Sequence, residues 1–272
     1  MSPGVSPGVS PRVSPIAQQR YWPLALLAPL AVTAVNLVPA LTSVAPARRL
    51  LLPGLAGMSD SDAVALTYDD GPDPASTPAF LDLLDRHDTR ATFFLLGAHV
   101  TDNAALVREM ADRGHELAIH GWDHQCLALK RPGRIRGELA RAAEAVEAAT
   151  GRSPGYYRPP YGVLTAEGAY AARSAGLQTV LWSTWGRDWS RRATPDSVVR
   201  KVERVLAPGG TVLLHDTDRT SATGSWRTTL AASEVLLTSW RARGIRAIPL
   251  RDHGIGVGRR TPEPIVWTTQ DN

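Results

Sequence analysis

Two adjacent carboxylates, Asp69 and Asp70, stand between an apolar run at residues 63–66 and the pair Gly71-Pro72. An apolar run followed by Gly-Pro is typical of a strand that ends in a turn. Because neighbouring side chains at a strand end point in different directions, one carboxylate can bind a metal while the other acts as a base. The alternative is a solvated Asp-Asp-Gly turn, so the interpretation depends on the residues downstream.

Two histidines four positions apart, His120 and His124, follow a later apolar run. If the residues between them form a turn, both rings reach one ion, and with Asp70 they make a set of two histidines and one carboxylate that leaves a position open for water. This set suits zinc. The motif is not that of the zincins, because Gly121 follows His120 and the motif supplies no glutamate base. Two unrelated loop histidines are the alternative.

Two further apolar runs end in polar residues. Arg158 opens the sequence Arg-Pro-Pro-Tyr, a rigid turn that fixes the backbone direction and offers an amide to a developing oxyanion. The run at 211–214 leads to His215, which could protonate a leaving nitrogen. Each of these residues also fits a purely structural role when it is considered alone.

The elements that must position these residues follow from the alternation of short apolar runs with longer amphipathic ones, which is typical of a parallel sheet wrapped by helices. All the polar residues above lie at carboxyl ends of predicted strands, the face on which α/β barrels carry their sites. We therefore predict a distorted (β/α) barrel of about seven strands. The predicted strands are 64–68, 91–96, 116–120, 155–158, 179–183, 211–215 and 246–250, and the predicted helices are 77–87, 103–113, 135–150, 165–175, 195–206 and 225–243, with glycines 114, 151, 176 and 244 at helix ends.

The 272 residues, 43% of them hydrophobic, predict one folded domain with extensions. Residues 1–20 carry a Ser-Pro repeat that is too poor in apolar surface to fold, and we expect a disordered tail. The folded domain is predicted at 60–252 and a C-terminal tail at 253–272.

A hydrophobic segment is predicted at 21–47. The stretch Tyr21–Leu41 carries no charge and is about as long as a bilayer requires, so it is a candidate membrane anchor. Small residues at Val38-Pro39-Ala40 also suit cleavage of a signal peptide, and a buried helix is a third alternative. An anchor or a signal implies export, with the catalytic domain outside the cytoplasm.

The formal charge of +4 comes almost wholly from arginines that are scattered among acidic residues. No basic block is interleaved with aromatics, so nucleic-acid binding is not indicated, whereas attraction to an anionic wall or membrane surface is compatible with the charge. The single cysteine, Cys126, excludes an intrachain disulfide. We expect a monomeric catalytic domain.

Taken in order, these motifs resemble those of the polysaccharide deacetylases with a NodB homology domain, carbohydrate esterase family 4, over residues 64–250. The resemblance implies a distorted (β/α) barrel and a Zn²⁺ cofactor, or another divalent ion such as Co²⁺. It implies that Thr-Tyr-Asp-Asp-Gly supplies Asp69 as the catalytic base and Asp70 as a metal ligand. The His-x-x-x-His motif supplies His120 and His124 as the other ligands.

The resemblance also implies roles for residues near the later strand ends. Arg158 holds the base carboxylate, and the backbone amide of Tyr161 binds the oxyanion. The Leu-x-His motif places Leu213 in the acetyl pocket and makes His215 the general acid, which Asp188 orients.

The Asp-Trp motif of the family matches Asp188-Trp189, in a stretch rich in tryptophan. Trp189 is implied to form a wall of the acetyl pocket, and Trp182 is expected to pack in the core. The family usually has Ser or Thr where this chain has Gly121, so the metal loop of this chain lacks a steadying hydroxyl. Family members often have an aspartate where this chain has Trp185, so we expect the substrate contacts at this position to differ.

The implied activity is metal-dependent removal of N-acetyl groups from a polysaccharide that contains N-acetylglucosamine, either peptidoglycan or a chitin-like polymer. Three alternatives remain: an O-acetyl esterase acting on xylan or another glycan, a non-catalytic carbohydrate-binding relative, and a membrane-tethered structural protein whose function lies in the Pro-rich tail. Intact Asp69 and His215 argue against a pure binding protein, which needs neither a base nor an acid.

Overall fold

The computed structural model describes residues 36–38, 40, 44, 48, 55–131 and 133–255. The predicted tail at 1–20, most of the hydrophobic segment at 21–47 and most of the C-terminal tail lie outside these residues, and the proposed domain bounds stay predictions. Within the described ranges, no helix has both the length and the hydrophobicity needed to cross a bilayer.

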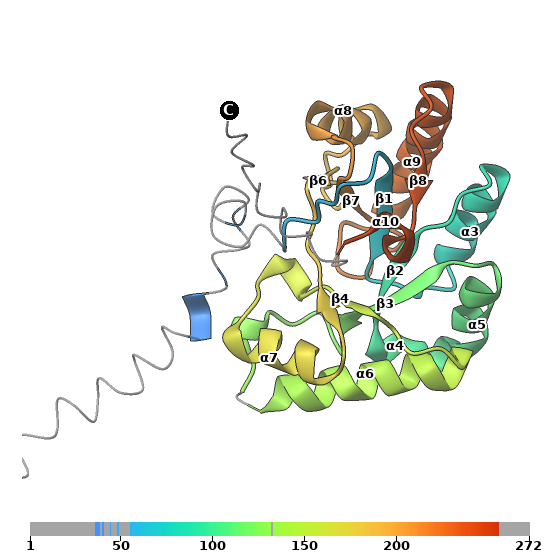
Figure 1. Cartoon of the computed structure of the whole chain (residues 1–272). Helices are drawn as coiled ribbons and strands as arrows, with labels where there is room; N and C mark the ends of the chain where they lie inside the picture. Colours follow the sequence, from blue (N-terminus) through green and yellow to red (C-terminus); the bar gives the residue numbers. More distant parts are fainter. Residues whose placement is uncertain are drawn as a thin grey trace, which may run out of the picture.

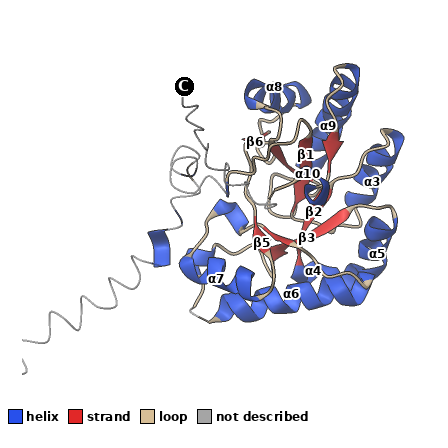
Figure 2. Cartoon of the chain, in the orientation of Figure 1, coloured by secondary structure: helices blue, strands red, loops and turns tan. Residues whose placement is uncertain are grey.

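One curled parallel sheet forms the distorted (β/α) barrel that the sequence predicts, with helices around it (Figures 1 and 2). Its strands follow the order β5-β4-β3-β2-β1-β7-β6, and β8 pairs with the start of β1. All pairs are parallel, so the carboxyl ends of the strands meet on one face. The strands are β1 Val64–Asp69, β2 Thr92–Leu96, β3 Glu116–Gly121, β4 Tyr156–Tyr157, β5 Gln178–Thr179, β6 Thr184–Trp185, β7 Thr211–His215 and β8 Ala247–Ile248.

All six predicted helices are confirmed, with bounds within two residues of those expected. The four glycines predicted to end helices have positive φ, which is the left-handed conformation that a helix terminus favours. The helices are α3 Thr77–Arg86, α4 Gly97–Val100, α5 Ala104–Asp112, α6 Arg134–Thr150, α7 Ala166–Ser174, α8 Pro195–Val205, α9 Ser225–Ala242 and α10 Leu250–His253, with short 3₁₀ turns η3 Thr101–Asn103, η4 Leu127–Leu129 and η5 Pro160–Gly162.

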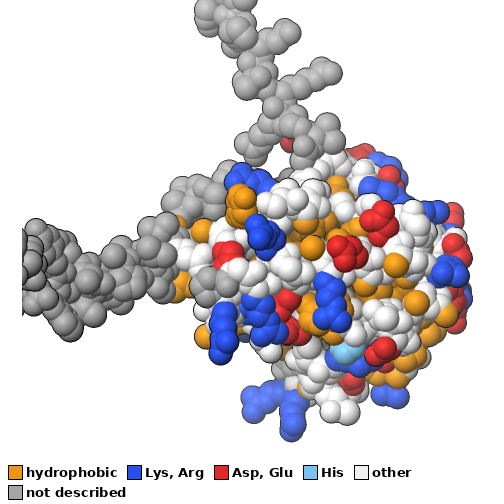
Figure 3. Space-filling model, turned by 90° about the horizontal axis from the view of Figure 1, so that it is seen from below, with side chains coloured by type: hydrophobic (Ala, Val, Ile, Leu, Met, Phe, Trp, Pro, Cys, Tyr) orange, Lys and Arg blue, Asp and Glu red, His pale blue; other side chains and the backbone are white. Residues whose placement is uncertain are grey.

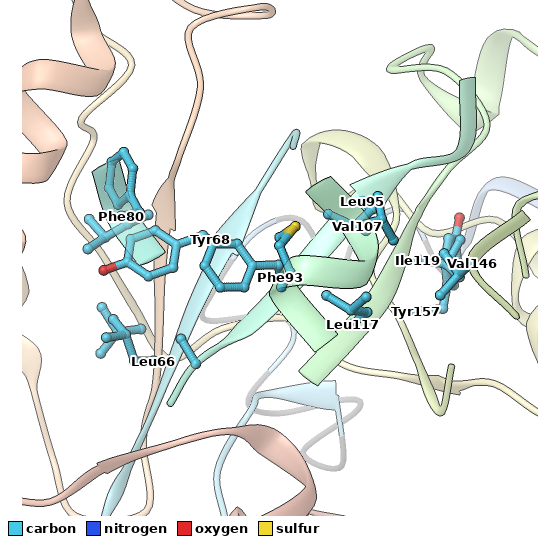
Figure 4. Close-up of a cluster of buried hydrophobic side chains, with 14 of the residues drawn as sticks. Leu66, Tyr68, Phe80, Phe93, Leu95, Val107, Leu117, Ile119, Val146 and Tyr157 are labelled. Atoms are coloured by element: carbon cyan, nitrogen blue, oxygen red, sulfur yellow. The ribbon is translucent and has the colours of Figure 1, made fainter. Parts of the chain in front are cut away.

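Alternation along the central strands separates the core into two sides. One set of side chains faces the helices and makes the main buried cluster, where Tyr68 lies between Phe80 of α3 and Phe93 of β2 (Figure 4). Each such buried side chain contributes about 1.5–3 kcal/mol to folding. The alternate residues point into the barrel, where a smaller cluster contains Ala65, Phe94 and Ala118. Asp69 belongs to this inward set.

The predicted strand at 179–183 is wrong as a single element. The chain pairs with β4 at β5, crosses the opening of the barrel at 180–183, and then pairs with β7 at β6. Since β5 and β6 are the two ends of the sheet, this crossing segment joins them.

Arginine side chains bind the carbonyl groups of the crossing segment. Arg158 donates from Nε to Val180 at 3.3 Å and from a terminal nitrogen to Leu181 at 3.0 Å. Arg48 donates to the carbonyl of Trp182 at 2.6 Å. Buried carbonyls need partners, and these guanidinium groups replace strand partners at the opening. A strand pattern in the sequence gives no sign of side chains that donate to backbone carbonyls in this way.

On the face seen in Figure 3, Lys and Arg side chains lie among acidic and hydrophobic ones. They do not merge into the continuous basic surface that nucleic-acid binding uses.

Candidate active site

The carboxyl ends of β1, β3 and β7 bring together the acidic and imidazole side chains that the sequence predicts for the metal, the base and the acid, while Arg158 and Tyr161 follow β4 and Asp188 and Trp189 follow β6. Asp69 ends β1 and His215 ends β7, and the two are register partners on these adjacent strands. His120 lies in β3, and His124 follows it in the loop. A pocket of about 200 Å³ opens here. Its lining is Asp69, His120, His124, Tyr161, Gly162, Trp182, Trp185, Trp189, Leu213, His215, Thr220 and Ser221.

Asp70, His120 and His124 converge as a candidate metal centre, with one ligand atom from each lying within 4.8 Å of the others. Oδ1 of Asp70 is 3.4 Å from Nε2 of His120 and 3.3 Å from Nε2 of His124. This oxygen is buried and has no hydrogen-bond partner among the described residues. A buried carboxylate oxygen facing two imidazole nitrogens fits a divalent cation such as zinc.

A hydrogen bond orients the ring of His120 for metal binding. Its Nδ1 lies 2.8 Å from the carbonyl oxygen of Arg158, so Nδ1 carries the proton and donates. In the neutral ring, this tautomer leaves Nε2, which faces Asp70, available as a ligand.

The protonation states also suit a cation. Burial lowers the pKa of His124 to about 4, even though Asp70 opposes the shift, so the ring is neutral at neutral pH. Burial acts to raise the pKa of Asp70, but the protonated ring of His215, first among the neighbouring histidines, and a hydrogen bond from Thr220 outweigh it and lower that pKa. An ionised carboxylate beside a neutral imidazole is the form that binds a metal.

The backbone separates the two adjacent carboxylates. Asp70 adopts a φ of 80°, a left-handed conformation that aspartate tolerates better than most residues. The chain therefore turns between Asp69 and Asp70. Asp69 enters the barrel and Asp70 faces the histidines, which is the division predicted for two neighbouring acids.

Arg158 binds the carboxylate of Asp69 inside the barrel. A terminal nitrogen of the guanidinium lies 2.6 Å from Oδ1 of Asp69 and 2.9 Å from the hydroxyl of Thr67. Arg158 is fully buried and Asp69 nearly so, hence each charge depends on the other for compensation.

Asp188 holds His215 in place through both carboxylate oxygens. These oxygens lie 3.1 and 3.2 Å from Nδ1 of the ring, and one of them accepts the backbone amide of His215 at 2.8 Å. The hydroxyl of Thr229 donates to the same carboxylate at 2.9 Å. Burial acts to lower the pKa of His215, but Asp188 outweighs it and raises that pKa to about 10. The ring is protonated at neutral pH.

Aromatic and apolar side chains form the walls. Trp189 meets His215 edge to face at 5.4 Å, and Leu213 lines the pocket beside them. Trp182 was expected only in the core; it is indeed buried, but one side of it also lines the pocket. Trp185 lies between the other two indoles, with ring centres 5.9 Å from Trp182 and 4.9 Å from Trp189.

Tyr161 also lines the pocket, in the turn after Arg158. Its ring is 59% exposed and lies edge-on to His124 at 4.5 Å. Its φ of 60° is uncommon for a residue with a side chain, and such conformations gather at functional sites.

Gly121 has a structural explanation. Its φ is 117°, and a Cβ there would lie 3.3 Å from the carbonyl oxygen of Asp123, so a side chain is disfavoured. The loop is steadied instead by Lys130, which is 2.6 Å from Asp123 and also binds Glu138. An ion-pair network thus supports the metal loop in place of a hydroxyl.

The sequence reasoning missed Thr220 and Ser221, which lie in the loop between β7 and α9 and line the pocket. The hydroxyl of Thr220 donates to Oδ2 of Asp70. The available signal was a hydroxyl-rich stretch directly after the strand that delivers His215.

Fold and site together define an α/β barrel protein with a candidate metal centre beside a carboxylate held by arginine and an imidazole held by aspartate. The sequence profile described as polysaccharide deacetylase matches residues 56–180. A chitooligosaccharide deacetylase of Bradyrhizobium sp. (strain ANU 289) is 36% identical over 204 residues, which cover 71% of this chain and 91% of that protein. The chain belongs to the polysaccharide deacetylase family, carbohydrate esterase family 4.

Other comparisons agree. The peptidoglycan-N-acetylglucosamine deacetylase PgdA of Listeria monocytogenes is 34% identical over 69% of this chain, which spans only 38% of that protein. The solved Bc1960 peptidoglycan N-acetylglucosamine deacetylase superposes with a TM-score of 0.67 at 28% identity, covering 73% of this chain and 91% of that one. A family 4 acetyl xylan esterase from Clostridium thermocellum, solved with a cobalt ion, superposes with a TM-score of 0.65 at 28% identity, covering 71% of this chain and 90% of that one.

Proposed function

We propose that this protein is a metal-dependent hydrolase that removes N-acetyl groups from a polysaccharide containing N-acetylglucosamine. The observation that carries the proposal is the arrangement of Asp69 and His215 on adjacent strands beside the Asp70, His120 and His124 set. A carboxylate base and a protonated imidazole acid at one pocket are what hydrolysis of an amide requires.

Asp70, His120 and His124 hold the cation, for which zinc is our first choice and cobalt a second. When bound, a cation of this kind polarises the acetyl carbonyl and lowers the pKa of water. The neutral ring of His124 and the ionised carboxylate of Asp70 make the set competent to bind it at neutral pH.

The remaining residues move protons and stabilise charge. Asp69 takes the proton of the attacking water, and the guanidinium of Arg158 keeps its carboxylate in place. The backbone amide of Tyr161 donates to the developing oxyanion. His215, kept protonated by Asp188, gives its proton to the departing amine.

Trp189 and Leu213 bound the space beside His215 and exclude water from the acetyl methyl group. The sugar to which that acetyl is attached lies toward the open side of the pocket. The named substrates of the relatives, chitooligosaccharide and peptidoglycan N-acetylglucosamine, support a polymer of N-acetylglucosamine as the substrate here.

Such polymers lie outside the cytoplasm, which suits the predicted export of the chain through the uncharged stretch Tyr21–Leu41 as an anchor or signal. We propose that the catalytic domain works there as a monomer on the polysaccharide, without a nucleic-acid partner.

O-acetyl ester hydrolysis is the second candidate, and the structural likeness to an acetyl xylan esterase supports it. The ion pair of Asp188 with His215 favours the amide, because an amine leaves only when it is protonated whereas an alcohol leaves more readily. A non-catalytic binding role has less support, since a binding protein gains nothing from keeping both Asp69 and His215.

The test is acetate release by residues 46–272 from N-acetylglucosamine oligomers, peptidoglycan and acetylated xylan. Each substrate is tested with enzyme as prepared, after chelation, and after chelation followed by added zinc. We expect release from an amino-sugar substrate that chelation abolishes and zinc restores. Release from xylan alone would establish the esterase, and zinc binding without release from any substrate would favour the binding role.

A further inference from the structure

We propose that Thr220 is a positioning residue of the metal centre. Its hydroxyl holds one oxygen of Asp70 so that the other oxygen faces His120 and His124. This inference rests on the proposed function, because it assigns Thr220 to the metal site used there.

The two oxygens of Asp70 have different surroundings. Oδ2 accepts the hydroxyl of Thr220, whereas Oδ1 has no hydrogen-bond partner in the described chain and lies within 3.4 Å of both imidazole Nε2 atoms. The carboxylate is fully buried, so bulk water does not compete for either oxygen. A single outer hydrogen bond therefore fixes the rotation of the carboxylate and leaves Oδ1 directed at the cation position.

The loop that carries Thr220 is itself anchored to the turn that carries Asp70. The hydroxyl of Thr217 donates to Oδ2 of Asp73 at 2.7 Å, and Nε of Arg219 lies 3.3 Å from the same oxygen. Asp73 follows Asp70 by three residues. Two side chains of the loop thus bind one carboxylate of the turn, which preorganises the hydroxyl of Thr220 before a cation arrives.

The far side of the loop is fixed to the wall of the pocket. The backbone amide of Ala222 donates to the carbonyl of Trp189 at 3.1 Å, and the amide of Gly224 donates to the carboxylate of Asp218. The hydroxyl contact to the candidate metal centre comes from Thr220, on the loop after β7. Outer contacts of this kind typically change metal affinity by about 10–100-fold when they are removed.

The experiment measures zinc dissociation constants by competition with a chromogenic chelator, using the full chain stripped of metal. Thr220→Val removes the hydroxyl and keeps the shape, Thr220→Ser keeps the hydroxyl, and Thr223→Val makes the same change at an exposed position of the same loop. We expect affinity about 10–100-fold weaker in Thr220→Val. Thr220→Ser should stay within about threefold of the native protein, and Thr223→Val should match it.

Thermal unfolding of the metal-free variants shows whether each has folded, and the visible spectrum of the cobalt form reports ligand geometry without any assay of activity. Zinc affinity in folded Thr220→Val within twofold of native would overturn the inference. Equal losses in Thr220→Val and Thr220→Ser would also overturn it, because the hydroxyl would not be the cause. A native protein that binds no zinc would overturn the metal centre of the proposed function as well, which separates the two failures.

Discussion

Asp69 and His215 are register partners on the parallel strands β1 and β7, and each has its own buried partner of opposite charge. Arg158 binds Asp69 at 2.6 Å, and Asp188 binds His215 at 3.1 Å. The carboxylate and the imidazole are therefore held independently, although they share one edge of one pocket. Each can be perturbed without moving the other.

Replacing Asp69 by asparagine tests this independence. We expect Asp69→Asn to lose acetate release by at least about 10²–10⁴-fold, because the amide accepts no proton from water. Zinc affinity should stay within a few-fold, since Asp69 is not in the metal set and Arg158 keeps bonds to Thr67 and Leu181. Kinetics and calorimetric zinc titration measure the two quantities.

Asp62→Asn, at an exposed carboxylate paired with Arg246, is the matched control and should leave both quantities unchanged. Loss of zinc binding in Asp69→Asn would mean that Asp69 is a ligand, and the assigned roles of Asp69 and Asp70 would have to be revised.

Replacing Asp188 by asparagine should move the alkaline limb of activity. The acid works only while His215 is protonated, and Asp188 raises its pKa to about 10 against the effect of burial. Without that charge the pKa falls, so activity should be lost at a pH lower by about 1–3 units. The measurement is kcat as a function of pH, with Asp196→Asn on the surface of α8 as the control. An unmoved alkaline limb would show that His215 is not the group that titrates.

Acid should destabilise the protein through His115. This residue directly precedes β3, at the end of the strand away from the active site. His115 is buried and its Nδ1 accepts the amide of Ala91, and burial lowers its pKa to about 4. Between pH 4 and the ordinary value of about 6.5, the unfolded chain binds a proton that the folded chain does not. The corresponding stability is complete above about pH 6.5 and is lost as the pH falls toward 4, by about 3 kcal/mol in total.

Urea unfolding at several pH values measures this loss. His115→Asn keeps an acceptor for Ala91 and removes the titration, so its stability should fall less between pH 7 and pH 5 than that of the native protein. An equal fall in both proteins would contradict the assignment to His115.

Removing Arg48 should weaken the crossing segment. Its guanidinium donates to the carbonyl of Trp182 and lies 5.4 Å from the centre of that indole ring. Arg48→Ala should cost about 1–3 kcal/mol in urea unfolding, because a buried carbonyl loses its donor. It should also raise KM more than it lowers kcat, since Trp182 lines the pocket. Arg86→Ala, at an exposed ion pair with Glu234, should change neither value appreciably.

Much of the fold followed from periodicity alone. The helices from Thr77–Arg86 to Ser225–Ala242 each repeat apolar residues at helical spacing and end near a glycine or a turn, so their bounds were predictable. The segment at 180–183 was not, because its carbonyls bind Arg158 and Arg48, residues distant in sequence. Tertiary hydrogen bonds of this kind leave no local pattern.

Some residues of the candidate site were also predictable from the sequence, and others were not. Asp70, His120 and His124 were predictable because metal binding needs particular side chains at strand ends, and these are visible in sequence. Thr220 was not, since a single hydroxyl in a loop is common and only the fold brings it to Asp70. Trp182 was expected in the core and is buried, but its place in the crossing segment also exposes one side of it to the pocket.

The crossing segment also affects how this protein meets other copies of itself. The strands at both ends of the sheet, β5 and β6, contain two residues each, and one continuous piece of chain supplies both. An open sheet normally presents a row of unpaired amides and carbonyls on which another chain can add a strand, and very short edge strands are one way in which proteins avoid this. The barrel therefore offers little template for intermolecular β-pairing, even though its opening is not sealed by a full ladder of hydrogen bonds.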